Sequence, residues 1–150
     1  MLLLKKISLG VLGLFIIMQL YRPELEKKSL KDSSSFEEIY NVPVNIKTML
    51  KNSCNDCHSN TTNFPWYAQV QPFRFLIYNH IIEGRSNLNF SEFGDYSERK
   101  KANKIKSMVS QIKSNEMPIS SYELMHSNAH LNIGQKDSLL IWLKLLNASL

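Results

Sequence analysis

The sequence predicts an all-α protein in which one helical domain follows an N-terminal apolar helix. Three observations favour this class. Apolar side chains between residues 97 and 115 recur at helical spacing. Residues 132–146 combine a helix-capping sequence with an almost continuously apolar stretch. An apolar run at residues 7–20 follows two lysines near the N-terminus.

The N-terminal segment has the features of an export signal. Lys5 and Lys6 precede the apolar run, as in the charged and apolar regions of such signals. Because no small-x-small cleavage pattern follows, we predict that residues 1–22 form an uncleaved signal anchor. The run is shorter than the roughly 20 apolar residues that span a bilayer, although lysines that snorkel to the interface would extend it. The rest of the chain is expected on the periplasmic side of a bacterial inner membrane, or exported if the signal is cleaved.

A polar segment separates this anchor from the domain. Residues 23–40 are charged and polar and show no apolar periodicity, which predicts a flexible tether. Residues 41–150 have the length of a single domain and contain no internal repeat.

The net charge of +5 is unevenly distributed along the chain. Residues 97–113 hold six basic side chains and one acidic side chain, whereas the remainder of residues 23–150 is net negative. One basic segment on an exported domain does not support nucleic-acid binding. We therefore predict no nucleic-acid partner.

The first helix of the domain leads into a short motif. Pro43 suits a helix start, and the following apolar residues give a partly apolar face. Residues 54–58 then read Cys-Asn-Asp-Cys-His, which is the attachment signature of a c-type haem. On one turn of helix, Cys54 and Cys57 can bind along one edge of a porphyrin, and His58 is then placed as the proximal axial ligand. The motif predicts one covalently attached haem.

Three other interpretations of the two cysteines are weaker. A zinc site needs four ligands, and the chain has no second cysteine pair. A thioredoxin-like redox pair needs a strand before it, and no strand pattern precedes Cys54. A structural disulfide is compatible with an oxidising compartment, but it leaves the adjacent His58 unexplained.

Three further helices complete the predicted domain. After a break at residues 64–67, a helix is expected over residues 71–82, with Gly84 as its stop. The next helix spans about residues 97–115, where one stripe is expected to be buried: Ile105, Met108, Val109 and Ile112. The last helix starts at a capping box formed by Asn132 and Gln135, and its nearly uniform apolarity predicts a buried helix.

A second iron ligand is expected from a methionine or a histidine. Met117 is the preferred candidate because it follows a helix and precedes Pro118, which restricts its backbone to an extended conformation. The alternatives are His80, His126 and His130. The other methionines that we considered, at positions 49, 108 and 125, are expected to fill the core.

This layout resembles the small single-haem cytochromes c, and more narrowly the bacterial haem-binding domain proteins. The resemblance covers about residue 42 to the end of the chain. It rests on these segments: Cys54-Asn-Asp-Cys57-His58-Ser-Asn60, Phe64-Pro-Trp66-Tyr67, Glu83-Gly84-Arg85, Leu88-Asn-Phe-Ser91, Glu116-Met117-Pro118, Tyr122, and His126 followed by Ala129 and Leu131. It implies a cytochrome c-like helical domain over residues 41–150.

The resemblance also implies roles for individual residues. Cys54 and Cys57 are expected as thioether anchors, His58 as proximal ligand and Met117 as distal ligand. The second choice for the distal position is His126, whose alternative is a surface histidine. Two further side chains are candidates for binding the haem propionates through charged or indole hydrogen bonds: Arg85, otherwise a solvated arginine, and Trp66, otherwise a core tryptophan.

Two functions fit these predictions. The first is a membrane-tethered one-electron carrier that serves an unknown redox partner, because a six-coordinate iron with a thioether ligand changes oxidation state with little rearrangement. The second is a haem enzyme or gas sensor with a displaceable distal ligand. A weaker third interpretation is an interaction module with a structural haem. We favour the electron carrier over the enzyme. The basic segment at residues 97–113 is then either a solvated face or a surface that attracts an acidic partner.

Overall fold

The computed structural model describes residues 1–24 and 34–150, and these residues contain helices and no strand. The predicted all-α class is confirmed. In chain order the elements are α1 (Leu2–Met18), α2 (Phe36–Ile39), α3 (Val44–Ser53), α4 (Asn55–His58), η2 (Trp66–Gln69), α5 (Phe73–Asn87), η3 (Phe90–Asp95), α6 (Glu98–Lys113), α7 (Ser120–Met125), η4 (Ser127–Ala129) and α8 (Ile133–Ala148), with η for 3-10 helices.

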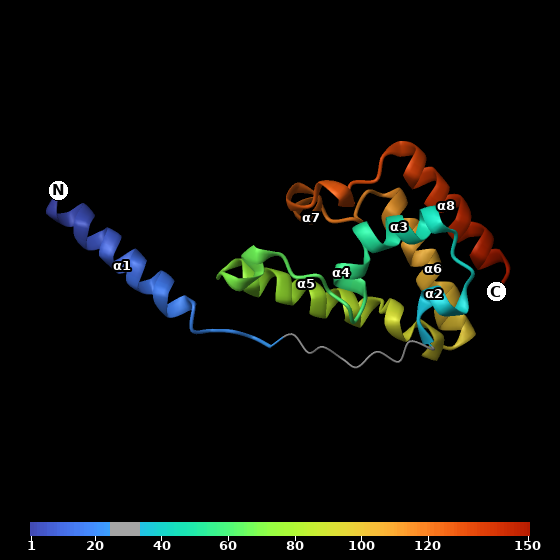
Figure 1. Ribbon diagram of the computed structural model, residues 1–150, viewed down its shortest axis with the longest axis horizontal. Helices are drawn as coiled ribbons and strands as arrows, with labels where there is room; N and C mark the ends of the chain where they lie inside the picture. Colours follow the sequence, from blue (N-terminus) through green and yellow to red (C-terminus); the bar gives the residue numbers. More distant parts are fainter. Residues whose placement is uncertain (25–33) are drawn as a thin grey trace.

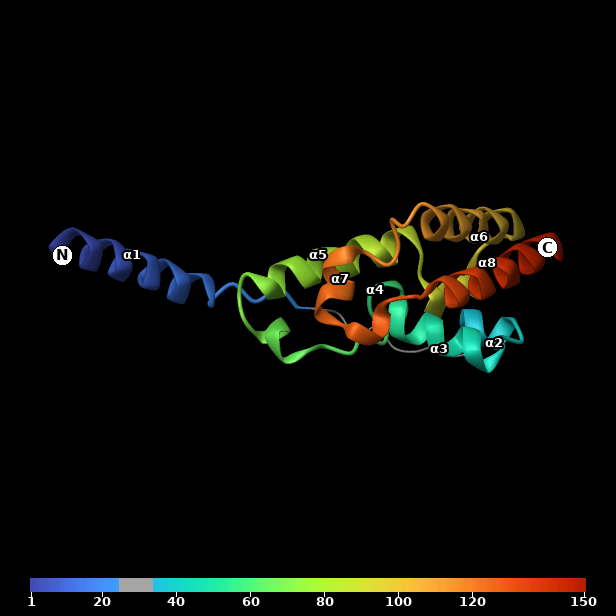
Figure 2. The ribbon, with the colours of Figure 1, turned by 90° about the horizontal axis from the view of Figure 1, so that it is seen from above.

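Helix α1 stands apart from the helices of the domain, beyond the end at which α5 begins (Figures 1 and 2). It is apolar, and none of its residues is buried. Within the described part of the chain, no helix combines the length and the hydrophobicity that a membrane crossing requires. The signal anchor at residues 1–22 therefore remains a prediction.

The domain begins earlier than the sequence predicts. Within the predicted tether, residues 25–33 lie outside the described part of the chain. Ser35 caps α2 by accepting a hydrogen bond from the backbone N–H of Glu38, and Phe36 is buried with 1% exposure. Phe36 thus belongs to the core although it lies within the predicted tether, because a single aromatic side chain in a polar stretch gives no periodic signal.

Helix α3 starts as predicted, with Pro43 at its N-cap position. Its buried face consists of Ile46, Met49, Leu50 and Ser53, and α3 packs against α8 and leads directly into α4. Val44, in the first turn, is 81% exposed and lies outside this buried face.

Helix α5 does not stop at Gly84. It continues to Asn87, and Gly84 is buried inside it. A Cβ atom built on Gly84 would lie 2.6 Å from the backbone oxygen of Cys57. The glycine therefore permits a close approach of α4 to α5, and it does not act as a helix cap.

Helices α6 and α8 pack along each other, and their predicted starts are correct. The capping box of α8 is present, with both hydrogen bonds between Asn132 and Gln135 at 2.9 Å. Helix α8 is nevertheless only partly buried. Leu139 and Leu143 are fully buried, whereas Ile141 and Leu145 are 59% and 66% exposed, because no described element covers that side of the helix.

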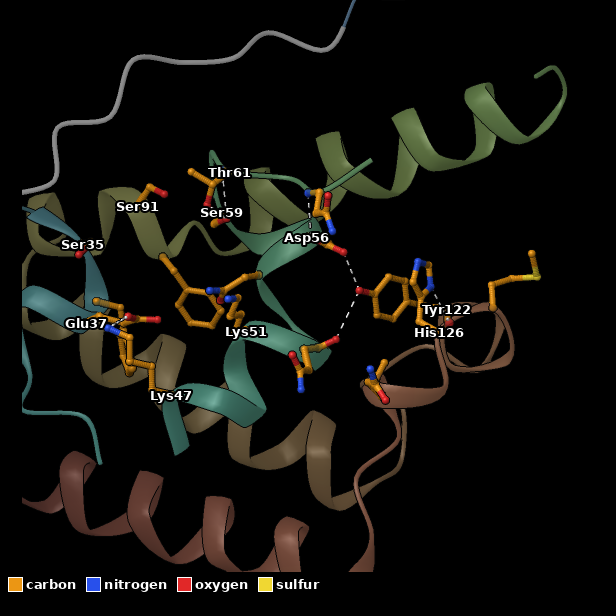
Figure 3. Close-up of a pocket in the computed structure, with 18 of the residues that line it drawn as sticks. Ser35, Glu37, Lys47, Lys51, Asp56, Ser59, Thr61, Ser91, Tyr122 and His126 are labelled. Carbon is orange, nitrogen blue, oxygen red and sulfur yellow. Dashed lines mark hydrogen bonds and ion pairs between the residues drawn. The ribbon is translucent and has the colours of Figure 1, made fainter. Parts of the chain in front are cut away.

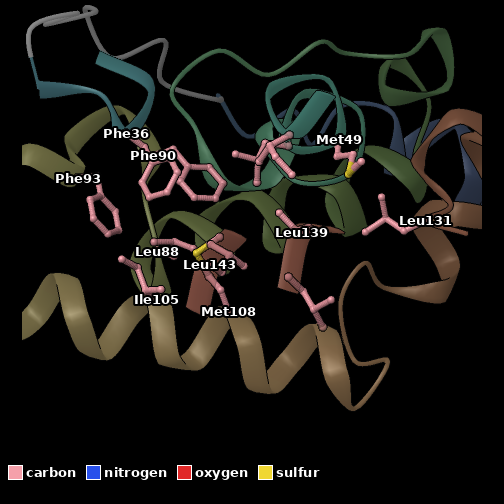
Figure 4. Close-up of a cluster of buried hydrophobic side chains, with 13 residues drawn as sticks. Phe36, Met49, Leu88, Phe90, Phe93, Ile105, Met108, Leu131, Leu139 and Leu143 are labelled. Atoms are coloured by element: carbon pink, nitrogen blue, oxygen red, sulfur yellow. The ribbon is translucent and has the colours of Figure 1, made fainter. Parts of the chain in front are cut away.

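The hydrophobic core lies where α3, η3, α6 and α8 meet (Figure 4). The predicted stripe of α6 contributes three buried residues to it, while Val109 packs against the core from its edge. The buried core residues are Phe36, Ile46, Met49, Leu50, Leu88, Phe90, Phe93, Ile105, Met108, Ile112, Leu131, Leu139 and Leu143.

Candidate haem site

The signature residues form a short helix of their own. The backbone N–H of Cys54 donates to Leu50 at the end of α3, and the N–H of His58 donates to Cys54 at 3.0 Å, so that one turn of helix carries both cysteines and the histidine. Both cysteine side chains are free thiols in this structure. The predicted placement of the motif on one turn of helix is confirmed.

Both cysteines and His58 line one cavity of about 540 Å³, together with Met117. This volume lies within the roughly 300–1,000 Å³ of small-molecule and cofactor sites. One part of the lining comes from α4 and α5, and the other from α6 and the segment that follows it. The remaining lining residues are Ser53, His80, Glu83, Gly84, Asn87, Leu88, Phe90, Lys104, Ser107, Met108, Gln111, Ile112, Pro118, Ile119 and Tyr122.

The orientation of the His58 ring is fixed through its Nδ1 atom. Nδ1 lies 3.0 Å from the backbone oxygen of Gly84 and 3.0 Å from that of Leu88. Since both oxygens are acceptors, Nδ1 carries the proton and Nε2 is the unprotonated nitrogen. Burial lowers the pKa of His58 and favours this neutral ring. A neutral imidazole that is held through its other nitrogen is the form that ligates a metal.

Both cysteines are poor candidates for a reactive redox pair. Burial raises the pKa of Cys54 to about 12 and that of Cys57 to about 11. Catalytic thiols of redox pairs have lowered pKa values instead.

Among residues 1–24 and 34–150, no group of three or more histidine, cysteine, aspartate or glutamate side chains is arranged to hold a metal ion.

The loop after the signature is held by buried polar contacts. The amide of Asn89 donates to the Asn60 side chain at 2.9 Å, and the backbone N–H of Asn60 donates to the Ser91 hydroxyl at 3.0 Å. Asn60 and Asn89 are both buried. The segment Leu88–Ser91 therefore fixes the loop that leaves His58, while Leu88 also accepts from the His58 ring.

The two predicted propionate-binding residues lie outside the cavity lining. Arg85 donates to the backbone oxygen of Ser59 at 2.8 Å and to the Thr62 hydroxyl at 3.1 Å, so it holds the same loop. Trp66 is 80% exposed and contacts Tyr67. The structure therefore gives Arg85 a positioning role and places Trp66 on the surface.

Met117 is positioned by the end of α6. Asn115 adopts a left-handed conformation with φ 61°, its N–H donates to Ile112, and the N–H of Glu116 donates to Gln111 at 3.0 Å. These two bonds form a Schellman motif, in which asparagine can replace the usual glycine. The N–H of Met117 also donates to Gln111, at 3.2 Å. The helix end therefore directs the half-buried Met117 to the cavity.

The structure separates the three histidines that compete with Met117. His80 is exposed at the edge of the cavity that holds the signature. His130 is exposed and lies 3.4 Å from the carboxylate of Glu123. His126 lines a different cavity, and its ring nitrogens contact the backbone oxygen of Tyr122 and the hydroxyl of Tyr67. His126, the second choice from the sequence, is therefore not brought together with the signature.

That second cavity, of about 740 Å³, is lined mostly by residues with polar side chains (Figure 3). Phe90 and Tyr122 line both this cavity and the cavity of the signature. The Tyr122 hydroxyl donates to the Asp56 carboxylate at 2.7 Å, and its ring stacks on His126. Asp56 also accepts from the backbone N–H of Asn63 at 3.0 Å. A variable position of the signature thus connects α4 to α7, and the motif itself gives no signal for this contact.

The haem-binding domain family matches residues 13–145. The chain belongs to this family. No curated protein and no solved structure matches the chain. As a haem-binding domain protein, the chain has haem as its cofactor, and the residues around the cavity fit that group. They provide two thiols, an unprotonated imidazole nitrogen and a thioether on an apolar wall.

Proposed function

We propose that this haem-binding domain protein is a c-type one-electron carrier with a single covalent haem. The observation that supports it is the convergence of Cys54, Cys57, His58 and Met117 on one cavity. In this proposal the cysteines are thioether anchors, His58 is the proximal ligand and Met117 is the distal ligand. The bound haem supplies a one-electron couple at its iron.

The surroundings of the site suit an electron carrier. The hydrogen bonds of His58, the contacts of Gly84 with Cys57 and the helix end before Met117 hold both predicted ligands on rigid elements. Little rearrangement is then needed when the oxidation state changes. The apolar lining residues limit the access of water to the site. Both this exclusion of water and a thioether ligand raise the reduction potential of a haem iron.

We further propose that residues 1–22 anchor the protein in the inner membrane, with the domain on the periplasmic side. Lys5 and Lys6 near the start of α1 support this orientation, because short cytoplasmic segments are enriched in basic residues. The redox partner in this proposal is a protein that meets the domain in the periplasm.

Covalent attachment is tested by replacing both cysteines. After maturation in a host that attaches c-type haem, denaturing electrophoresis with haem staining should show colour on the parent chain. The Cys54→Ala/Cys57→Ala variant should show none. The matched control is Asn55→Ala, which changes the motif at a variable position and should keep the colour. Colour on the double variant, or a colourless parent, would contradict the proposal.

A haem enzyme or gas sensor is the second candidate, and the position of His80 favours it. A histidine at the edge of the cavity is a possible acid or base for a ligand bound at the iron. Such a protein needs an open distal position. Carbon monoxide added to the reduced protein separates the candidates. An electron carrier whose iron is ligated by Met117 should show little change in its absorption spectrum. A sensor with an open distal position should convert completely to the spectrum of the carbon monoxide complex.

A further inference from the structure

One end of the domain carries a cluster of exposed apolar side chains. They come from η2, the first turns of α5 and the end of α7. Single exposed apolar residues are common, but a contiguous cluster marks an interaction surface. We call this cluster the apolar end surface, and its members are Trp66 (80% exposed), Phe73 (47%), Phe75 (43%), Leu76 (49%), Leu124 (84%) and Met125 (51%).

The three elements are connected to one another. The Tyr67 hydroxyl lies 3.2 Å from Nε2 of His126, which joins η2 to the end of α7. The Tyr67 ring also contacts Phe73 at the start of α5, with ring centroids 6.0 Å apart. These contacts bring η2, the start of α5 and the end of α7 together at one end of the domain.

This surface adjoins the end of α1. The backbone N–H of Gln71 donates to the Gln19 side chain at 2.9 Å, and the guanidinium of Arg74 donates to the backbone oxygen of Pro23 at 3.1 Å. The rings of Tyr21 and Phe75 are 6.3 Å apart. Both views show α1 leaving the domain at the end where α5 begins, whereas α2 and α8 lie at the other end (Figures 1 and 2).

The composition of this end suits lipid headgroups. From residue 59 to residue 82 the only charged side chain is Arg74, and the single carboxylate of α7, Glu123, lies 3.4 Å from His130. Arg22, which precedes the Pro23 that Arg74 contacts, adds a second cation. Aromatic side chains at the interface and cations beside anionic headgroups are the features by which proteins rest on a bilayer.

We propose that the apolar end surface is a second membrane contact, which lies in the headgroup region beside the anchor. This inference rests on the proposed anchoring of residues 1–22. The contact would also add to the membrane binding of a short anchor. The 17 residues of α1 extend only about 26 Å, which is less than the roughly 30 Å thickness of the hydrocarbon core. The contact would fix the orientation of the haem domain relative to the membrane.

The two tryptophans of the chain provide the test, because Trp66 belongs to the apolar end surface and Trp142 packs against Phe36 in the core. The full-length holoprotein is reconstituted in vesicles of phosphatidylcholine and phosphatidylglycerol, with or without bromine near the headgroup end of the acyl chains. Trp142→Phe leaves Trp66 as the only tryptophan, and Trp66→Phe is the matched control. The ratio of emission in the two lipids cancels any quenching by haem.

Bromine should reduce the emission of Trp66 at least twofold and leave the emission of Trp142 unchanged. The unmodified chain should show the corresponding partial loss, which covers the case that one variant folds poorly. Flotation of the vesicles reports the anchor separately. If the protein floats with the vesicles but Trp66 emits equally in both lipids, this inference is overturned and the proposed anchor stands. If the emission is equal and the protein is also a dimer in detergent, the inference is overturned and the surface is assigned to contact with a second copy of the chain. A chain that does not float overturns both.

Discussion

At the scale of single residues, Gly84 couples the haem signature to α5. Its missing side chain lets the helix approach Cys57, and its backbone oxygen contacts the His58 ring. In Gly84→Ala, the new Cβ atom would lie 2.6 Å from a backbone oxygen that cannot move without displacing α4. We expect the free energy of unfolding to fall by about 1–3 kcal/mol, as for overpacked sites, and less haem to be attached. Denaturant unfolding and haem-to-protein ratio measure the two effects.

The control for this prediction is Gly134→Ala in the first turn of α8. The nearest atom to a Cβ at that position is 3.6 Å away, which is an ordinary contact. That variant should be as stable as the parent or slightly more stable, because alanine is the better helix former. Equal behaviour of the two variants would show that the close approach of α4 and α5 does not constrain the site.

Met117 carries the second prediction at this scale. In Met117→Ala, the weak absorption band at the red end of the visible spectrum of the ferric protein should disappear, because this band reports coordination of the iron by the methionine sulfur. The reduction potential should fall, within the roughly 0.8 V over which axial ligands set haem potentials, because a donor that favours ferrous iron is lost. Met125→Ala is the matched control, since Met125 lies outside the haem cavity and is half exposed, so that its predicted place in the core is wrong. A native spectrum in Met117→Ala would exclude Met117 as the ligand.

The residues proposed to attach and ligate the haem could be predicted from the sequence because their spacing is local. One turn of helix places Cys54, Cys57 and His58 whatever the rest of the fold does. The roles of Arg85 and Trp66 were not accessible, because they depend on which loop lies against α5. Likewise, only the approach of α4 distinguishes Gly84 as a contact glycine from the predicted helix stop.

At the scale of elements, the capping box makes α8 the clearest sequence prediction. Asn132 accepts from the N–H of Gln135, and this bond satisfies a backbone donor that has no partner within the helix. Asn132→Ala should lower the free energy of unfolding by about 1 kcal/mol, measured by thermal or denaturant unfolding. Asn103→Ala, at an exposed position within α6, should have no such cost. If both variants lose the same stability, the cap is not the cause.

Element predictions succeeded where one helix face carries the signal. The stripe of α6 follows from spacing alone, and most of it is buried as expected. In α8 the apolar residues surround the helix, so the sequence pattern does not show which side packs against α6. Ile141 and Leu145 lie on the side that stays exposed. Helix α2 was missed because four residues are too few to show a period, and Phe36 enters the core by a tertiary contact.

At the scale of the whole molecule, the basic residues of the domain are concentrated on α6, and some of them already have partners within the domain. The ammonium group of Lys100 lies 3.7 Å from the centre of the Tyr96 ring, and Lys101 pairs with Glu98 at 2.8 Å. Lys104 lines the haem cavity. Lys106 and Lys113 are exposed on the same helix. Steering of an acidic partner is best tested through these last two, because their replacement leaves the described contacts of α6 intact.

We expect the reduced holoprotein to be oxidised by the anion ferricyanide at a rate that falls as salt is added. The Debye length shortens from about 10 Å at 0.1 M to about 3 Å at 1 M salt, so that attraction by α6 is screened. Lys106→Glu/Lys113→Glu should slow this reaction and leave the haem spectrum unchanged. Lys51→Glu/Lys144→Glu changes the net charge equally on α3 and α8, and should have a smaller effect. If both double variants slow the reaction equally, ferricyanide responds to the net charge alone. If the rate changes neither with salt nor in either double variant, the α6 lysines are only a solvated surface.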